Sequence, residues 1–160
     1  MSKSATTSAS ATKSQSSAII ASLETLLSES YSLMAQTHLA HWNVEGEHFF
    51  ELHTAFQSQY EELFEAVDTV AEHIRTLDAY PPGGLSMLAG ISSLYESEER
   101  RMAAKDFVAH LVEGHENLVA HAKEGRTLAG EAGDAETEDL FIERLRSHEK
   151  TLWMLKSHLK

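Results

Sequence analysis

The segment that decides the fold is a turn between two long helical patterns, and it reads His41-Trp42-Asn43-Val44-Glu45-Gly46-Glu47-His48-Phe49. Asn43 and Gly46 are typical of turns, whereas apolar residues recur at helical spacing on both sides of this segment. The first pattern runs from Ile19 to His41, and the second runs from Phe49 to about Leu77. The sequence therefore predicts a helical hairpin.

Four potential metal ligands belong to this hairpin, namely His41, His53, Asp68 and Glu72. On a helix, Asp68 and Glu72 lie on one face about one turn apart, and His53 returns to nearly the same face. Imidazole and carboxylate groups together suit iron, zinc or manganese. The alternative is two core histidines and two solvated carboxylates. We expect the carboxylates to lie beside the apolar stripe, where an unpaired charge is costly, so metal binding is favoured.

The distance along the helix prevents one chain from bringing all four groups together. Fifteen residues separate His53 from Asp68, and this length of helix spans roughly 22 Å, whereas metal–ligand bonds are about 2 Å long. The turn places His41 at the same end of the hairpin as His53. A second copy of the chain, related by a twofold axis, would supply the missing half. The spacing therefore predicts a metal site shared by two subunits.

The rest of the chain predicts an all-α four-helix bundle of the ferritin-like type, preceded by a tail. Residues 1–16 are mostly Ser, Thr and Ala with no apolar stripe, so we expect a disordered tail followed by one domain over residues 17–160. Two further helical patterns occupy residues 102–119 and 140–159. The long connection over residues 78–101 contains Pro-Pro-Gly-Gly and has room for a short helix.

The composition excludes several classes of protein. A net charge of −12 argues against a surface that binds nucleic acid broadly. The chain has no cysteine, which excludes disulfides and thiolate metal sites and fits a cytoplasmic protein. It has neither the ~20-residue apolar run of a membrane span nor the pattern of a secretory signal, so we expect no membrane partner.

The ordered set of motifs resembles the Dps family, the miniferritins of starved bacterial cells. The matching elements are His41-Trp42-Asn43-Val44-x-Gly46, Leu52-His53-x-x-Phe56, Asp68-x-x-Ala71-Glu72, Pro81-Pro82-Gly83 and His148-Glu149-Lys150-x-x-Trp153-Met154-Leu155. The resemblance covers roughly residues 17–160.

The resemblance implies a hollow homododecamer with ferroxidase centres at its twofold interfaces. His41 and His53 of one subunit would face Asp68 and Glu72 of its neighbour. Fe(II) would be oxidised there, preferentially by hydrogen peroxide, and Fe(III) would be stored in the cavity, with zinc as another occupant of the site. Such a protein protects the cell and its DNA from oxidative damage.

The sequence also departs from the family pattern. Gln57 stands where the family often has an acidic residue near the iron, so the second iron position is expected to be weaker or filled by water. The tail has only two lysines, Lys3 and Lys13, so we expect weak or absent DNA binding. A nucleoid-associated protein and a bundle with structural zinc are the rival functions.

Several other residues have two interpretations each. Trp42 and Tyr60 are either core aromatics or, for Trp42, an interceptor of stray oxidising equivalents. His38 and His73 are either neighbours of the site or extra ligands, and we expect His148 to be a hydrogen-bonded core histidine.

The acidic residues have the same ambiguity. Asp134 and Asp139 either begin a solvated helix or, as the resemblance implies, line a threefold pore for iron. The acids Glu61, Glu62 and Glu65 face either a mineral cavity or water.

Overall fold

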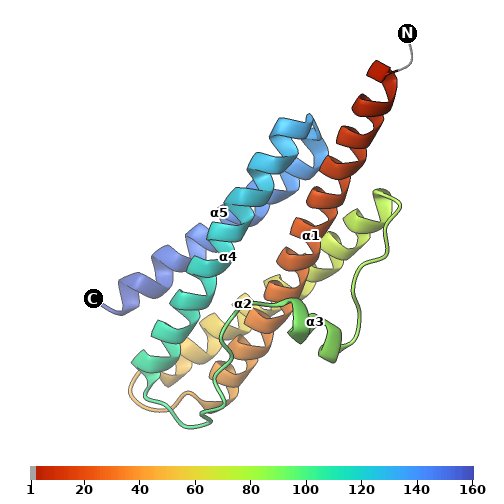
Figure 1. Ribbon diagram of the computed structural model, residues 1–160. Helices are drawn as coiled ribbons and strands as arrows, with labels where there is room; N and C mark the ends of the chain where they lie inside the picture. Colours follow the sequence, from red (N-terminus) through yellow and green to blue (C-terminus); the bar gives the residue numbers. More distant parts are fainter. Residues whose placement is uncertain (1–2) are drawn as a thin grey trace.

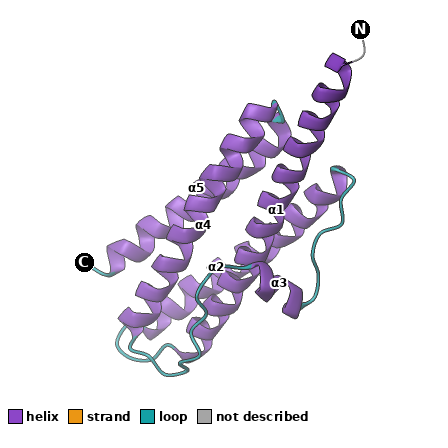
Figure 2. Ribbon diagram, viewed as in Figure 1, coloured by secondary structure: helices purple, strands orange, loops and turns teal. Residues whose placement is uncertain are grey.

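The computed structural model describes residues 3–160, with side chains described from Ser14 onward. Within these residues the chain forms helices and no strand (Figures 1 and 2): α1 (Lys3–Asn43), α2 (Phe49–Thr76), α3 (Leu85–Ile91), α4 (Ala104–Ala132) and α5 (Ala135–His158). The four long helices form a bundle, and short α3 lies against α1 within the connection from α2 to α4. The predicted all-α bundle with a short helix in its long connection is confirmed.

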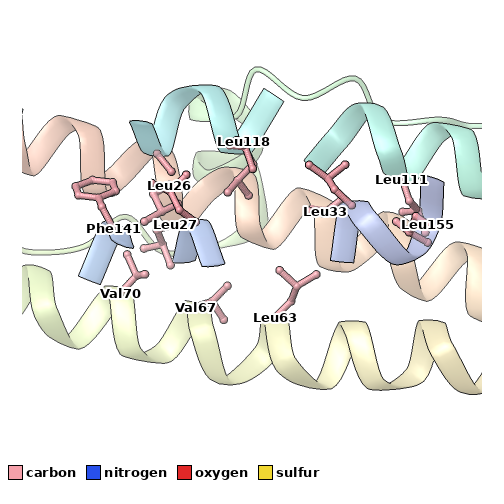
Figure 3. Close-up of a cluster of buried hydrophobic side chains, with 14 of the residues drawn as sticks. Leu26, Leu27, Leu33, Leu63, Val67, Val70, Leu111, Leu118, Phe141 and Leu155 are labelled. Atoms are coloured by element: carbon pink, nitrogen blue, oxygen red, sulfur yellow. The ribbon is translucent and has the colours of Figure 1, made fainter. Parts of the chain in front are cut away.

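The core is made of apolar side chains from all four long helices. Figure 3 shows several of them, including Leu33 from α1, Leu63 from α2, Leu111 from α4 and Phe141 from α5, all essentially inaccessible to solvent. Burying each such side chain stabilises the fold by about 1.5–3 kcal/mol. The helices pair as α1 with α2, α1 with α4, and α4 with α5, whereas α2 and α5 approach each other less closely.

The N-terminal segment differs from our expectation. We expected residues 1–16 to be disordered, but α1 begins at Lys3 and extends beyond the other helices (Figure 1). Residues 3–16 contain neither proline nor glycine, and alanine and lysine favour the helical backbone. The side chains of residues 14–18 are exposed, and within residues 14–160 the first buried apolar residue is Ile19. A bundle domain that starts at residue 17 remains our proposal, and residues 1 and 2 lie outside the described part.

The helix boundaries follow turn chemistry. Helix α2 ends at Thr76, close to the predicted Leu77, and Asp78 has a left-handed backbone with φ of 60°. Helix α4 continues to Ala132, and of the predicted glycine-containing turn only Gly133 and Asp134 lie outside the helices. None of the helices in residues 3–160 is long and apolar enough to span a membrane.

One glycine of α4 lies where two other helices pack closely against it. A Cβ atom at Gly125 would overlap the Phe141 ring and lie 2.5 Å from Ser22 Oγ. We expect Gly125→Ala to lower the free energy of unfolding by about 1–3 kcal/mol, because overpacking forces a well-packed core to shift. Urea unfolding measures this change. Gly90→Ala in α3 is the control, since nothing lies within 4 Å of the added Cβ. Equal stability of the Gly125→Ala variant and the native chain would contradict the prediction.

Candidate metal centre

The hairpin between α1 and α2 brings two predicted ligands together. His41 lies in the last turn of α1 and His53 near the start of α2, and their ring centroids are 3.8 Å apart. His41 Nδ1 lies 2.9 Å from the backbone oxygen of His53, and His53 Nδ1 lies 2.9 Å from the backbone oxygen of His41. A carbonyl oxygen only accepts, so each Nδ1 carries the proton and donates it. In a neutral imidazole, each Nε2 then keeps a lone pair for a metal ion.

Three further aromatic side chains pack around this histidine pair. The His38 ring stacks on Trp42 at 5.2 Å and lies 4.1 Å from the Tyr60 ring. The Tyr60 ring in turn makes a T-shaped contact with His41 at 5.2 Å. Burial, and then the charge of His41, lowers the pKa of His38 below its ordinary value. Trp42 is 68% exposed, so its interpretation as a core aromatic of the subunit is wrong.

The predicted carboxylates lie on the surface of α2. Asp68 and Glu72 are both exposed, so the expectation that they lie buried beside the apolar stripe is wrong for the single subunit. Asp68 lines a pocket of about 370 Å³ together with Phe64, which is 61% exposed. An exposed phenylalanine beside a candidate ligand is the kind of surface that a second subunit covers.

The four predicted ligands do not converge within one chain. In residues 14–160, where side chains are described, no group of three His, Asp or Glu residues lies close enough to hold one metal ion. His53 lies near the start of α2, beside His41 of α1, and the carboxylates lie fifteen and nineteen residues further along α2 than His53. This separation agrees with the helix geometry, and sharing of the site between subunits stays a prediction.

The remaining candidates near the centre have partners of their own. The Gln57 amide donates to Glu61 Oε1 at 2.8 Å, so it is held by a carboxylate on the exposed side of α2. His73 Nε2 lies 2.8 Å from Thr137 Oγ1, which ties α2 to α5. This contact supports the interpretation of His73 as a neighbour of the site.

The two predicted pore residues lie at the start of α5. Asp134 is its N-cap, because its carboxylate accepts from Thr137 N at 3.0 Å and from Thr137 Oγ1 at 2.7 Å. The interpretation as a helix start is therefore confirmed for Asp134. Asp139 is exposed, and a pore lined by either residue stays a prediction.

Sequence reasoning missed a polar cluster inside the bundle. It contains Glu62 of α2, His115 of α4, and Arg144 and His148 of α5; we call it the interior cluster. Arg144 pairs with Glu62 through bonds of 2.6 and 3.1 Å, and His148 Nδ1 lies 3.0 Å from His115 Nδ1. His148 is thus a hydrogen-bonded core histidine as predicted. Glu62 is partly solvated, with its carboxylate held by Arg144 and Ser147, and a role of Glu61, Glu62 and Glu65 at a mineral cavity stays a prediction.

A signal for this cluster was present in the sequence. Arg144 comes three residues after Phe141 and four before His148, so it occupies the buried stripe of α5. A charged residue in such a stripe indicates a buried partner. Burial alone would raise the pKa of Glu62, but the hydrogen bond and charge of Arg144, with Ser147, lower it below its ordinary value.

Comparisons with known proteins agree with the fold. The Ferritin-like domain family model matches residues 20–160. The "DNA protection during starvation protein" of Helicobacter pylori is 30% identical over 137 residues, which cover 86% of this chain and 95% of that protein.

Solved structures show the same similarity. The Dps protein of Vibrio cholerae, described as a ferritin-like diiron-carboxylate protein, has a TM-score of 0.87 and 33% identity, with 92% of each chain covered. The Dps protein of Bacillus brevis has a TM-score of 0.88 and 29% identity, and the match covers 92% of this chain and 98% of that one.

Proposed function

The chain belongs to the Dps proteins of the ferritin-like family, and from this premise we propose that it oxidises Fe(II) at centres shared between subunits and stores the Fe(III) product. The observation that carries the proposal is the reciprocal pairing of His41 and His53. Each Nδ1 is occupied by a backbone carbonyl of the other residue, so both Nε2 atoms are prepared as ligands.

The proposed centre combines this histidine pair with Asp68 and Glu72 of a twofold neighbour. Helix α2 holds Asp68 and Glu72 far from the histidine pair of their own chain. These carboxylates can therefore join only the histidine pair of another subunit. Hard carboxylate oxygens favour Fe(III) over Fe(II) and so favour oxidation of the bound ion. Coordination positions left open by the protein admit the oxidant.

We propose hydrogen peroxide as the preferred oxidant. Two Fe(II) ions give two electrons to one peroxide molecule, its O–O bond breaks, and two protons complete two water molecules, so no hydroxyl radical is released. The protein would thereby protect the cell and its DNA, and we place it in the cytoplasm. Peroxide-dependent oxidation of ferrous salt by the purified protein tests this function. A bundle that uses zinc only structurally would show no such activity.

We expect the chain to assemble as a closed homododecamer. Large apolar side chains that are exposed on the single subunit support assembly: Phe64, Tyr80, Leu85 and Met87. Light scattering at physiological pH and salt should give a mass about twelve times 17.7 kDa. A stable monomer would contradict both the assembly and the shared centre.

Removing residues 1–16 should leave the iron chemistry unchanged, because this segment contains no ligand of the proposed centre. The full chain should bind duplex DNA weakly or not at all at physiological salt, since its net charge is −12 and the segment has two lysines. Gel shifts at low and physiological salt measure this, with chelator present so that cations cannot bridge acidic surface to phosphate. Tight binding under these conditions would add direct DNA coating to the function.

A further inference from the structure

The interior cluster holds a guanidinium between two atoms that commonly bind metals. Arg144 Nη2 lies 3.1 Å from Glu62 Oε2 and 3.4 Å from His148 Nε2. Arg144 Nη1 lies 2.6 Å from the second oxygen of Glu62, which also accepts from Ser147 Oγ at 2.8 Å. The cation therefore bridges a carboxylate on α2 and an imidazole on α5.

The hydrogen bonds fix where the histidine protons lie. A guanidinium only donates, so His148 Nε2 accepts and presents a lone pair to Arg144. His148 then carries its proton on Nδ1 and donates it to His115 Nδ1. Burial lowers the pKa of His115 to about 4 and that of His148 well below its ordinary value, so both rings are neutral at pH 7.

This arrangement of polar groups between the helices costs free energy of folding. Arg144 Nε and His115 Nε2 are buried, and neither has a hydrogen-bond partner among the described residues. Arg144 is 4% exposed, whereas the side chain of its partner Glu62 is 41% exposed. Removing a guanidinium from water costs free energy, and one partly solvated carboxylate offsets this cost only in part. The cost suggests that the positive charge of Arg144 serves something other than folding.

An acidic pocket lies next to Arg144. A pocket of about 180 Å³ reaches Arg144 and is lined by the carboxylates of Glu62, Glu65 and Glu143. Acidic walls raise the local concentration of cations. A larger pocket of about 480 Å³ is also lined by Glu62, and by His115. Glu62 and Arg144 line the acidic pocket, and His148 Nε2 lies 3.4 Å from Arg144 Nη2, so an ion that replaced the guanidinium would meet both Glu62 and His148.

We propose that Arg144 is a built-in cation that occupies a latent metal site within the subunit, with Glu62 and His148 as its ligands. A divalent ion in place of Nη2 would need bonds of about 2.0–2.2 Å, so each ligand would move inward by about 1 Å, which side-chain rotation supplies. Arg144 is thus a specificity-determining residue that keeps the subunit interior closed to divalent metal. Exclusion of divalent metal by Arg144 does not depend on the proposed function. The further consequence, that iron binds only at the intersubunit centre, rests on the proposed function.

The test measures Co²⁺ binding in a background that carries His53→Ala and Asp68→Ala, which silences the proposed intersubunit centre. Adding Arg144→Ala should create a site for about one Co²⁺ per chain, visible by its d–d absorption and by equilibrium dialysis. Adding Arg144→Lys instead keeps a positive charge and should create no site. Adding His148→Phe to the Arg144→Ala chain should remove the new site.

Two results would overturn the inference. For a folded Arg144→Ala chain, one is Co²⁺ binding equal to that of its background, and the other is binding that survives His148→Phe. Circular dichroism checks folding, and if the Arg144→Ala chain is poorly folded, Co²⁺ should raise its Tm while leaving that of the Arg144→Lys chain unchanged. The absence of such a rise would equally overturn the inference. A native chain without peroxide-dependent ferrous oxidation would refute the proposed function and leave the cobalt result standing.

Discussion

Replacing His53 or Asp68 with alanine is expected to abolish fast ferrous oxidation while the assembly stays intact. Each change removes one ligand of the proposed centre. Loss of a group that only orients a metal ligand lowers activity about 10–100-fold. Loss of a ligand itself should lower the oxidation rate by more than this. Stopped-flow absorbance of the ferric product, after mixing with Fe(II) and peroxide, measures the rate. Light scattering shows whether the variants remain assembled.

Two matched controls come from the same hairpin. His48→Ala removes an imidazole and Glu51→Ala an exposed carboxylate, and neither belongs to the proposed centre. Both should oxidise iron at nearly the native rate. If the His53→Ala or Asp68→Ala protein also does so, the assignment of the centre is wrong.

The hydrogen bonds of the histidine pair make the His53 experiment specific. His41 Nδ1 donates to the backbone oxygen of residue 53, and this oxygen remains after substitution by alanine. His41 therefore keeps its orientation when the His53 imidazole is lost. A fall in activity would then report the missing ligand and not a general loosening of the hairpin.

The sequence predicts the hairpin and the ligand pairs because both depend on local spacing. The turn at Asn43 and Gly46 and the helical period are local properties, and they place His41 beside His53 without further information. The separation of Asp68 from His53 follows from the rise of one helix. These features required no knowledge of how distant segments pack.

The features that the sequence did not predict depend on packing between helices. The partner of Arg144 is Glu62, 82 residues earlier in the chain, and only the packing of the helices brings these two side chains together. The exposure of Trp42, Asp68 and Glu72 depends on which surfaces a single subunit leaves uncovered. The helical backbone of residues 3–16 continues the packed part of α1, and no apolar face of its own distinguishes this segment from a disordered one in the sequence.

Mixing two inactive variants should restore activity, because each would supply what the other lacks. In a pair of one His53→Ala chain and one Asp68→Ala chain, one centre has lost both groups and the other has its full ligand set. Random pairing makes half of the pairs mixed, so co-expressed variants should regain about a quarter of the native rate. Each variant expressed alone is the control. A centre built within one chain would give no recovery, even where mass spectrometry shows mixed assemblies.

A second mixture also distinguishes a centre shared between subunits from a centre within one chain. Co-expression of the native chain with a chain carrying both His53→Ala and Asp68→Ala leaves no intact centre in a mixed pair, since every centre there combines one intact half with one defective half. Only pairs of two native chains remain active, and they make up about a quarter of the total. A centre within one chain would instead leave about half of the native activity, because every native chain would work whatever its partner. A quarter in both mixtures is expected only when the histidines and carboxylates come from different subunits.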